Sequence, residues 1–524
     1  MQIDPSNGGL QTLDQLVQQI GSTVPPGNKF PIVLVSGFSG WGEALLGTLN
    51  YWGGFEDLPS ALQSAGYTVI VVRIGPLSSN WERACEVYAQ LTSNVFDAPN
   101  DCPVATIPID YGAIYPIRYN YKRNGLIKKA VLFGYLPPKW KWSSDNPVHF
   151  LCHSQGGNTI RLLIKLLSGN HGDLHPVYFA VADREKRIKS VVTLGTPYKG
   201  TTITNVVEVI QNLLPPNAIE LITRLVVSTS FKQPRVYDLH LDHWYFTRNG
   251  DESFRQMCTR IRPLVAVWWN GPVPLPGQPQ FPPHNGFYDN SISGVNDLSN
   301  FTGTTAHDIF YFSMSFDATQ QFPNVQLSVD ELNSLPVNRV ISTLDFFGLR
   351  GFIGNIATDP NIPFNPSTLD LARWFVRVAN GHLGGLGYFD KIPFPGTRVP
   401  RPDMLPFLTL FSIVMGGYVI PGNPAGLPNI NSADFQPNDG VVNTLSMSGP
   451  EGSRILNAAR FPINGLGSMA QAIATNALGT YWHFGENHTM DHADQIGVFT
   501  EGQTYREVDH MYMLFARLLT MLPP

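Results

Sequence analysis

The feature of this sequence that most constrains its fold is a repeated alternation of short apolar runs and longer segments with helical spacing. Four runs rich in β-branched residues have the length and composition of buried strands, at 31–37, 67–75, 147–154 and 189–197. Between them, the segments 81–91 and 158–167 place apolar side chains on one helical face, as Ile160, Leu163 and Ile164 do in the second. Strands that alternate with helices predict an α/β fold built on a mostly parallel central sheet.

The second half of the chain contains two stretches that are dense in proline. Residues 264–285 and 390–406 carry so many prolines that we expect extended loops there, while 307–316 between them has the pattern of another strand. The sequence contains no internal repeat. We therefore expect a single domain over residues 1–524, with insertions at 264–300 and 345–425.

Composition excludes several classes of protein. With 43% hydrophobic and 14% charged residues the chain can bury a large core, and a net charge of −5 over 524 residues provides no basic surface for nucleic acid. No apolar stretch approaches the roughly 20 residues of a transmembrane anchor, and residues 1–19 lack the basic start and apolar run of a signal peptide. The compartment stays open: cytoplasmic if Met1 is the native start, secreted if a leader has been removed.

Four cysteines are too few for a disulfide framework, and none belongs to a C-x-x-C pair. We expect Cys85, Cys102, Cys152 and Cys258 to be free thiols packed as small apolar groups. The alternative is a small loop closed by a bond between Cys85 and Cys102.

The strongest chemical signal is a turn between the run 147–154 and the helical segment that follows it, with the sequence Cys152-His153-Ser154-Gln155-Gly156-Gly157. A serine nucleophile needs this strand, turn and helix, because a sharp turn lifts its hydroxyl clear of the sheet and brings the backbone close to the helix. Gly156 supplies one small flank, whereas Cys152 stands where the G-x-S-x-G pattern has its first glycine. We interpret Ser154 as a nucleophile; the alternative is a chance serine in a strand-to-helix turn.

Serine is a weak nucleophile at neutral pH unless a histidine accepts its proton and a carboxylate orients that histidine. In a sheet enzyme of this type the chain order is serine, acid, histidine. Two late segments fit that order, with Asp439 in the first (437–443) and His492 in the second (490–494). We take these residues as acid and base, with His483 and His488 as rivals for the base that the sequence does not exclude.

Attack on an ester also requires two hydrogen-bond donors aimed at the oxyanion. One should be the backbone N–H of Gln155, directly after the nucleophile. The second should come from 36–40, the glycine-containing loop after the first strand, where we choose the N–H of Phe38. The alternative is that 36–40 is only a glycine-rich turn.

These residues resemble those of the staphylococcal and thermophilic-bacillus lipases, which form lipase family I.5 of the α/β-hydrolase superfamily. Eight segments that occur in the same order carry the resemblance: GFSGWG (37–42), NYWGG (50–54), GPLSSNWERACEVYAQL (75–91), HSQGG (153–157), TPYKGTT (196–202), VYDLHLDHW (236–244), NDGVVNTLSMSGP (438–450) and MDHADQIGV (490–498). The resemblance implies an α/β-hydrolase fold with a helical lid and insertions. It also implies the nucleophile Ser154, the acid Asp439, the base His492 and oxyanion donors at Phe38 and Gln155.

The metal positions of that family are altered in this chain. The resemblance places its structural zinc site at Glu82, Tyr115, Tyr121 and Asp242. Two carboxylates without imidazoles are poor ligands for tetrahedral zinc, so we expect none. For calcium, Asp494 fits one ligand position but Phe499 stands where a second aspartate is expected, which leaves that site in doubt.

The segment 200–232 has the pattern of a lid. Apolar residues at helical spacing lie on either side of a proline pair: Val206, Val209, Ile210 and Leu213, then Ile219, Ile222, Leu225 and Val226. The resemblance implies helices that cover an apolar acyl cleft and expose their apolar face only at a lipid surface. Without the resemblance, two ordinary core-packing helices are the better interpretation.

We therefore expect a lipase or carboxylic ester hydrolase. It would cleave acyl esters of the triacylglycerol type, with medium to long chains, through an acyl-enzyme, without a required cofactor and at a lipid–water interface. The same triad would serve an esterase, a phospholipase, a polyester hydrolase or an acyltransferase. A hypothesis of another class is an inactive hydrolase-fold protein that binds apolar ligands, which the altered turn and metal positions suggest.

Overall fold

Eight strands form one central sheet, in the order β11-β12-β8-β7-β6-β1-β2-β5. Their bounds are β1 Ile32–Val35, β2 Val69–Val71, β5 Val131–Phe133, β6 Val148–His153, β7 Ile188–Leu194, β8 Phe310–Phe316, β11 Ile455–Asn457 and β12 Tyr481–Asn487. All neighbours are parallel except β2 and β5, which are antiparallel. The predicted α/β fold with a mostly parallel sheet is confirmed, and each run that the sequence analysis assigned to a strand contains one.

The computed structural model describes most of the chain. Outside the described residues are 1, 23–26, 43, 46, 100–104, 113–120, 206–217, 233–234, 236, 272–281, 304, 322–397, 402–403, 419, 421–430, 432, 464–465, 467, 469–470, 473–475 and 501.

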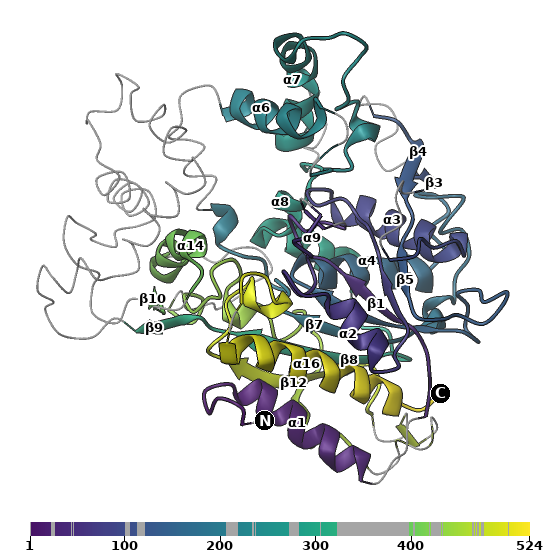
Figure 1. Ribbon diagram of the computed structural model, residues 1–524, viewed down its shortest axis with the longest axis vertical. Coiled ribbons are helices and arrows are strands. Elements are labelled where there is room, and N and C mark those ends of the chain that lie inside the picture. Colours follow the sequence, from purple (N-terminus) through teal and green to yellow (C-terminus); the bar gives the residue numbers. More distant parts are fainter. Residues whose placement is uncertain are drawn as a thin grey trace, which may run out of the picture.

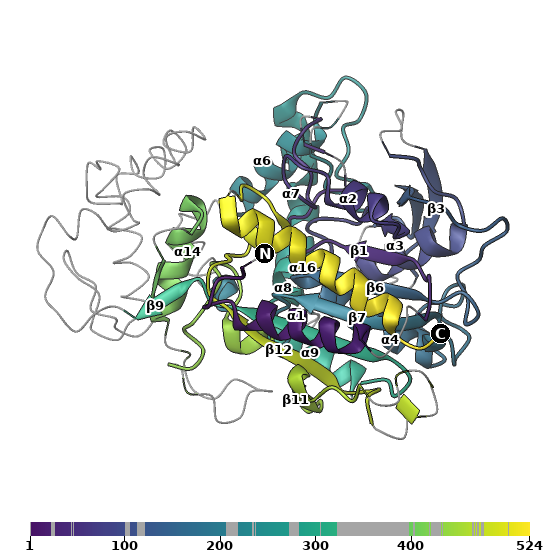
Figure 2. The same cartoon turned by 60° about the horizontal axis from the view of Figure 1, so that its bottom comes forward.

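Helices cover both faces of the sheet (Figures 1 and 2). On one face lie α1 (Gly8–Gly21), α2 (Leu58–Ser64) and α16 (Gly502–Met521), with α1 and α16 side by side. The other face carries α3 (Asn80–Ser93), α4 (Gln155–Ser168) and α9 (Ile292–Thr302). The helices predicted around 81–91 and 158–167 are α3 and α4.

The alternation of side chains along each strand divides the core into two clusters. Leu34 and Leu151 belong to the cluster under α1 and α16, while their neighbours Val33 and Phe150 belong to the cluster under α3 and α4. Successive side chains of a strand point to opposite faces, so a strand that is covered on both faces must be apolar throughout. Every residue of β6 and β7 is buried, which agrees with their mostly apolar sequences, although polar residues such as His149 and Ser190 are buried there as well.

A separate pair of helices, α6 (Ala218–Ser230) and α7 (Phe254–Asn270), lies beyond these layers around an apolar cluster of its own (Figure 1). The expectation of an extended loop from 264 is wrong at its start, because α7 contains Pro263 and continues to Asn270. Trp268 is fully buried and its ring lies 5.8 Å from that of Phe246. Tertiary packing therefore keeps this segment helical.

The two expected insertions differ in how much of them is described. Residues 286–302 form α8 (Gly286–Asp289) and α9, which packs against α4. Of 345–425, the described part contains β10 (Arg398–Pro400), paired antiparallel with β9 (Thr319–Gln321), and the helix α14 (Pro406–Gly417). The sequence analysis did not predict α14.

The smaller elements complete the chain. They are the antiparallel hairpin of β3 (Thr106–Asp110) and β4 (Asn124–Lys128), and the single 3₁₀ turns η1 (Glu185–Arg187), η2 (Asp242–Trp244), η3 (Thr444–Ser446), η4 (Ala458–Arg460) and η5 (Asp494–Ile496).

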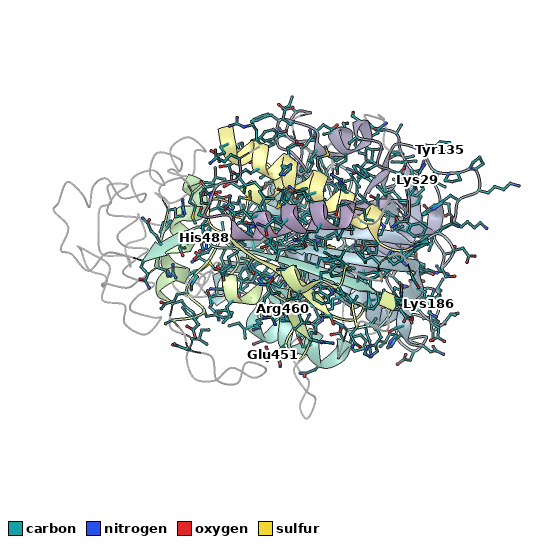
Figure 3. All side chains as sticks on the ribbon, turned by 90° about the horizontal axis from the view of Figure 1, so that it is seen from below. Lys29, Tyr135, Lys186, Glu451, Arg460 and His488 are labelled. Atoms are coloured by element: carbon teal, nitrogen blue, oxygen red, sulfur yellow. The ribbon has the colours of Figure 1, made fainter. Side chains whose placement is uncertain are left out.

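The thiol groups lie in the core and many charged side chains lie at the surface. Cys85, Cys152 and Cys258 are buried free thiols, and Cys102 lies outside the described residues. Charged side chains such as Lys186 and Glu451 lie at the periphery (Figure 3). None of the helices in the described part of the chain has both the length and the apolar character needed to cross a bilayer.

Candidate active site

Ser154 occupies the turn between the last residue of β6 and the first residue of α4, with φ 55° and ψ −130°. A residue other than glycine held at positive φ costs about 1–3 kcal/mol and persists only where the surroundings fix it. A Cβ on Gly156 would lie 2.6 Å from the carbonyl oxygen of Val35, so only glycine fits between the helix and β1. The turn has the geometry expected of a strained nucleophile elbow.

Cys152, which replaces the usual first glycine, does not disturb this turn. Its side chain is fully buried and belongs to the core cluster under α3 and α4. Cys152 therefore fits in place of the first glycine of the motif because its side chain packs in the core.

Asp439 and His492 meet although they are far apart in the chain. Nδ1 of His492 lies 2.7 Å from Oδ2 of Asp439, and the backbone N–H of His492 donates to the carbonyl oxygen of Asp439 at 2.9 Å. The carboxylate is fully buried, and its Oδ1 accepts the N–H groups of Val441 and Val442. Its Oδ2 also accepts a hydrogen bond from Nε2 of Gln495 at 2.7 Å. The carboxylate is thereby fixed in one orientation with four donors.

His492 also lies next to the serine turn, because its ring centroid is 4.5 Å from that of His153, the residue before Ser154. The two rival histidines have other partners. His483 lies near the hydroxyls of Ser313 and Ser315, and burial lowers its pKa to about 4. His488 is partly exposed beside Asp317 and Glu486.

The loop after β1 packs directly onto the serine. A Cβ on Gly37 would lie 2.5 Å from Cβ of Ser154, so the backbone of this loop touches that serine. The N–H of Gly37 donates to the hydroxyl of Tyr51 at 2.8 Å, and the N–H of Ser39 donates to the carbonyl of Pro76 at 2.8 Å. Phe38 lies between these two anchored residues, half-buried, with its ring 6.5 Å from that of Phe287.

Gln155 begins α4, where the first N–H groups of a helix have no partner within the helix. Its side chain is fully buried, and its Nε2 donates to the carbonyl of Ser78 and to Oδ1 of Asn80, at 3.3 and 3.2 Å. The side chain is thus fixed away from the serine, and the backbone N–H is the group of Gln155 that remains for an oxyanion.

Arg83 of α3 holds the loop after β1 from the side opposite Tyr51. Its guanidinium is fully buried and donates to the carbonyl oxygens of Ser36, Gly37 and Gly75 and, at 3.0 Å, to the hydroxyl of Thr159. Burial lowers the pKa of Arg83 to about 10. The arginine therefore stays charged at neutral pH and fixes the direction of the loop carbonyls.

Sequence reasoning missed Arg83, Tyr51 and Gln495. Arg83 follows Glu82 in a predicted helix, and the sequence does not show that its side chain points inward. For Tyr51 and Gln495 the sequence offers no signal, since each is defined only by distant partners.

The positions that the resemblance assigns to zinc do not form a metal site. Glu82 is fully engaged: its Oε1 accepts Nε2 of His243 at 2.6 Å and Nε1 of Trp244 at 2.7 Å, and its Oε2 accepts the N–H of Ser79. Asp242 is ion-paired with Arg235 at 2.6 Å instead.

The structure describes one of the other two zinc positions. The Tyr121 hydroxyl donates to a backbone carbonyl, and Tyr115 lies outside the described residues. Within the described ranges, no group of three or more histidine, cysteine or acidic side chains could hold a metal. These residues do not fit zinc.

The calcium candidate is a compact turn. Asp494 Oδ2 accepts the N–H of Asp491 at 2.9 Å, and Oδ1 of Asp491 accepts the N–H groups of Ala493 and Asp494. Phe499 has no oxygen in its side chain, and its ring packs 6.2 Å from that of Phe55 at the surface. The turn therefore offers Asp494 without a second acidic partner at 499.

Of the lid residues named from the sequence, Val206, Val209, Ile210 and Leu213 lie outside the described residues. Ile222 is half-buried in the α6–α7 cluster, while Leu225 is 55% exposed. The buried side of α6 is formed by Val226 and Val227.

The helix α14 lies against the loops that carry the acid and the base. A Cβ on Gly440 would lie 2.8 Å from Cβ of Leu408, so this helix touches the residue after Asp439. The N–H of Leu405 donates to Oδ2 of Asp491 at 2.6 Å, next to His492. An apolar helix thus borders the site.

Comparison with known proteins gives the family. The family model described as "Lipase-like, C-terminal domain" matches residues 28–337, more than half of the chain. The chain belongs to this family. A Staphylococcus hyicus protein named "Lipase" is 31% identical over 255 residues, which cover 45% of this chain and 34% of that protein. "Lipase 1" of Staphylococcus aureus is 27% identical over 325 residues, 58% of this chain and 41% of that protein.

The match therefore spans between a third and about two fifths of the length of these curated relatives. Solved structures share the fold over nearly the whole chain. EstA from Clostridium botulinum has a TM-score of 0.58 at 24% identity and covers 98% of both chains. The Staphylococcus hyicus lipase has a TM-score of 0.56 at 20% identity, with 94% of this chain and 96% of that chain covered. The α/β-hydrolase fold and the resemblance to staphylococcal lipases are confirmed.

Proposed function

We propose that this chain hydrolyses carboxylic esters of the lipase class, with Ser154 as nucleophile, His492 as general base and Asp439 as the acid that orients it. The observation that carries the proposal is the 2.7 Å contact of His492 Nδ1 with the buried carboxylate of Asp439, beside a serine held at φ 55°. A carboxylate on Nδ1 fixes the tautomer in which Nε2 is free to accept a proton.

In the first half of the reaction, Oγ of Ser154 attacks the ester carbonyl while Nε2 of His492 takes the hydroxyl proton. The carbonyl oxygen becomes an oxyanion, which the N–H groups of Phe38 and Gln155 stabilise. When the intermediate collapses, the bond to the alcohol breaks and the alcohol leaves with the proton from His492.

In the second half, His492 takes a proton from water, which attacks the acyl-enzyme. The resulting intermediate releases a carboxylic acid and returns the proton to Ser154. Asp439, held by its four hydrogen bonds, orients the imidazolium of His492 and stabilises it.

The apolar surroundings support a lipid-like acyl group rather than a small polar one. The sequence of α14, PFLTLFSIVMGG, contains no charged residue, and this helix borders the loops of Asp439 and His492. Leu225 of α6 is an exposed leucine within the segment that the sequence analysis assigned to a lid. An exposed apolar side chain of a lid becomes favourable where it meets lipid.

The first test is labelling with a fluorophosphonate, which reacts with an activated serine. We expect one label per chain, lost in Ser154→Ala. The matched control is Ser22→Ala, which removes an exposed serine whose hydroxyl bonds only to a neighbouring carbonyl. Equal labelling of the Ser154→Ala protein, or no labelling of the wild type, would contradict the proposal and favour a binding protein without catalysis.

The second test is a series of p-nitrophenyl esters from acetate to palmitate, with and without an emulsified lipid surface. We expect kcat/KM to rise from C2 to medium or long chains and to increase at the interface. A maximum at acetate with no response to the surface would show an esterase instead.

A further inference from the structure

Behind the serine, acid and base lies a second row of buried polar side chains that ester hydrolysis as described does not use. It begins at the loop after β1, where Tyr51 accepts the N–H of Gly37 at 2.8 Å. The same hydroxyl lies 2.7 Å from Nδ1 of His153. A hydroxyl oxygen that accepts from Gly37 can still donate its own proton to Nδ1, and in that tautomer the His153 ring carries its hydrogen on Nε2.

The row ends at the catalytic acid. Nε2 of Gln495 donates to Oδ2 of Asp439 at 2.7 Å, which orients the amide and leaves Oε1 on its other side. His153 Nε2 and Gln495 Oε1 are both buried, and neither makes a hydrogen bond within the described residues. A buried polar pair of this kind is costly unless its members bond to each other.

The electrostatics of His153 agree with this arrangement. Burial and the nearby His492 ring lower the pKa of His153 well below its usual value, while the Gln495 side chain and the His492 backbone, both close to the ring, raise it in part. The ring is therefore neutral, with one donor and one acceptor. All hydrogen bonds of the row then run in one direction, from the N–H of Gly37 to the carboxylate of Asp439, and such chains strengthen one another.

We propose that Tyr51, His153 and Gln495 are positioning residues that couple the oxyanion loop after β1 to the carboxylate of Asp439. None of the three is assigned a contact with the substrate. Their role is to set the direction of the Gly37–Phe38 backbone and the orientation of Asp439 together, so that donor and base are aligned on the same carbonyl group. This inference rests on the proposed ester hydrolysis.

A purely structural network would stabilise the fold without affecting the chemical step, and a double-mutant cycle separates the two roles. The variants are Tyr51→Phe, Gln495→Met and their combination, with rates expressed per serine that reacts with fluorophosphonate. Both changes preserve side-chain volume closely. We expect each single variant to lower kcat about 10- to 100-fold with KM changed less than about threefold, because misalignment affects the transition state.

The decisive quantity is the coupling between the two ends. If one chain connects them, cutting it twice is no worse than cutting it once, so the double variant should have a kcat within about threefold of the poorer single variant. If the two fold-losses multiply, the ends act independently and the proposal is wrong. The inhibition constant of an alkyl boronic acid, which forms a tetrahedral adduct on serine, should weaken in parallel with kcat/KM.

Two controls keep the test interpretable. Tyr198→Phe removes a buried hydroxyl that bonds Thr193 at 3.1 Å outside the row, and it should lower the melting temperature but leave kcat within about threefold of the wild type. If the first double variant does not fold, His153→Asn, which retains a polar atom near Nδ1 and loses Nε2, replaces Tyr51→Phe in the same cycle. A wild type that no fluorophosphonate labels would refute the hydrolase itself, whereas an active wild type with multiplying losses refutes only the coupling.

Discussion

Gly37→Ala is the sharpest test of the proposed site, since this glycine touches Ser154. The backbone at Gly37 does not have a positive φ, so an alanine there is strained only by its contacts. Its Cβ would lie 2.5 Å from Cβ of Ser154, 3.1 Å from Oγ of Ser154 and 3.0 Å from the Tyr51 hydroxyl. Non-bonded carbons approach to about 3.5–4.0 Å, so the serine or the loop must move by about 1 Å.

This displacement sets the expected magnitude. A misplacement of about 1 Å at reacting groups costs about 100-fold in rate, and overpacking a core site costs about 1–3 kcal/mol of stability. We therefore expect kcat of Gly37→Ala to fall about 100-fold or more, with a melting temperature lower by several degrees. The rate would be measured on a soluble p-nitrophenyl ester and the fold by circular dichroism.

The matched control is Gly8→Ala at the start of α1. A Cβ there would meet only the carbonyl oxygen of Glu486, at 3.7 Å, which is ordinary contact. This variant should keep full activity. If Gly37→Ala keeps a kcat within threefold of the wild type, the loop after β1 does not pack on the serine as described, and the assignment of Phe38 fails with it.

Three further predictions concern buried charges. Arg83→Met leaves three backbone carbonyls without their donor, and we expect it to lower the free energy of unfolding in urea by about 3–5 kcal/mol and kcat about 10-fold. If Arg83→Lys loses as much stability and kcat as Arg83→Met, the positive charge alone is insufficient. Glu82→Gln should destabilise the contact between α3 and η2 by about 2–4 kcal/mol, because the variant loses the charge that holds His243 and Trp244, and its amide nitrogen cannot accept the N–H of Ser79 as Oε2 does. An unchanged melting temperature would contradict this. Burial raises the pKa of Glu86 to about 8, so the folded state keeps a proton that the unfolded state releases near pH 4.5. Between pH 4.5 and 8, the stability of the wild type should fall by up to about 1.4 kcal/mol per pH unit relative to Glu86→Gln. If the stabilities of the two proteins depend on pH in the same way, the pKa of Glu86 is not raised.

The Glu86→Gln comparison is informative because the amide can imitate the neutral acid. Oε2 of Glu86 accepts the N–H of Gly75 at 2.6 Å, and Oε1 lies 3.0 Å from the hydroxyl of Tyr111. A glutamine can accept the first hydrogen bond with its oxygen and donate the second with its amide. The variant therefore removes the titration while it keeps both contacts.

Local patterns in the sequence were sufficient for much of the fold. Buried strands are mostly apolar because both faces of the sheet are covered, and β6 and β7 are examples that the sequence predicted. The turn at Ser154 could also be predicted from the sequence, since a glycine after it is needed where the helix approaches β1. The start of α7 shows the limit: prolines after 270 suggested a loop, but the burial of Trp268 keeps the preceding residues helical.

The sequence by itself determined the order of strands and helices, the nucleophile turn and the two late segments that carry an acid and a histidine. These features depend on the spacing and turn preferences of neighbouring residues, which can be recognised in the amino-acid sequence. Only the tertiary structure shows that His492, rather than His483 or His488, contacts Asp439, because this contact joins residues 53 positions apart in the chain. The same holds for Tyr51, which meets His153 across 102 residues, and for Arg83 beneath the loop after β1. Hydrogen bonds between distant segments follow from how the layers pack, and packing is a property of the whole chain rather than of any stretch of it.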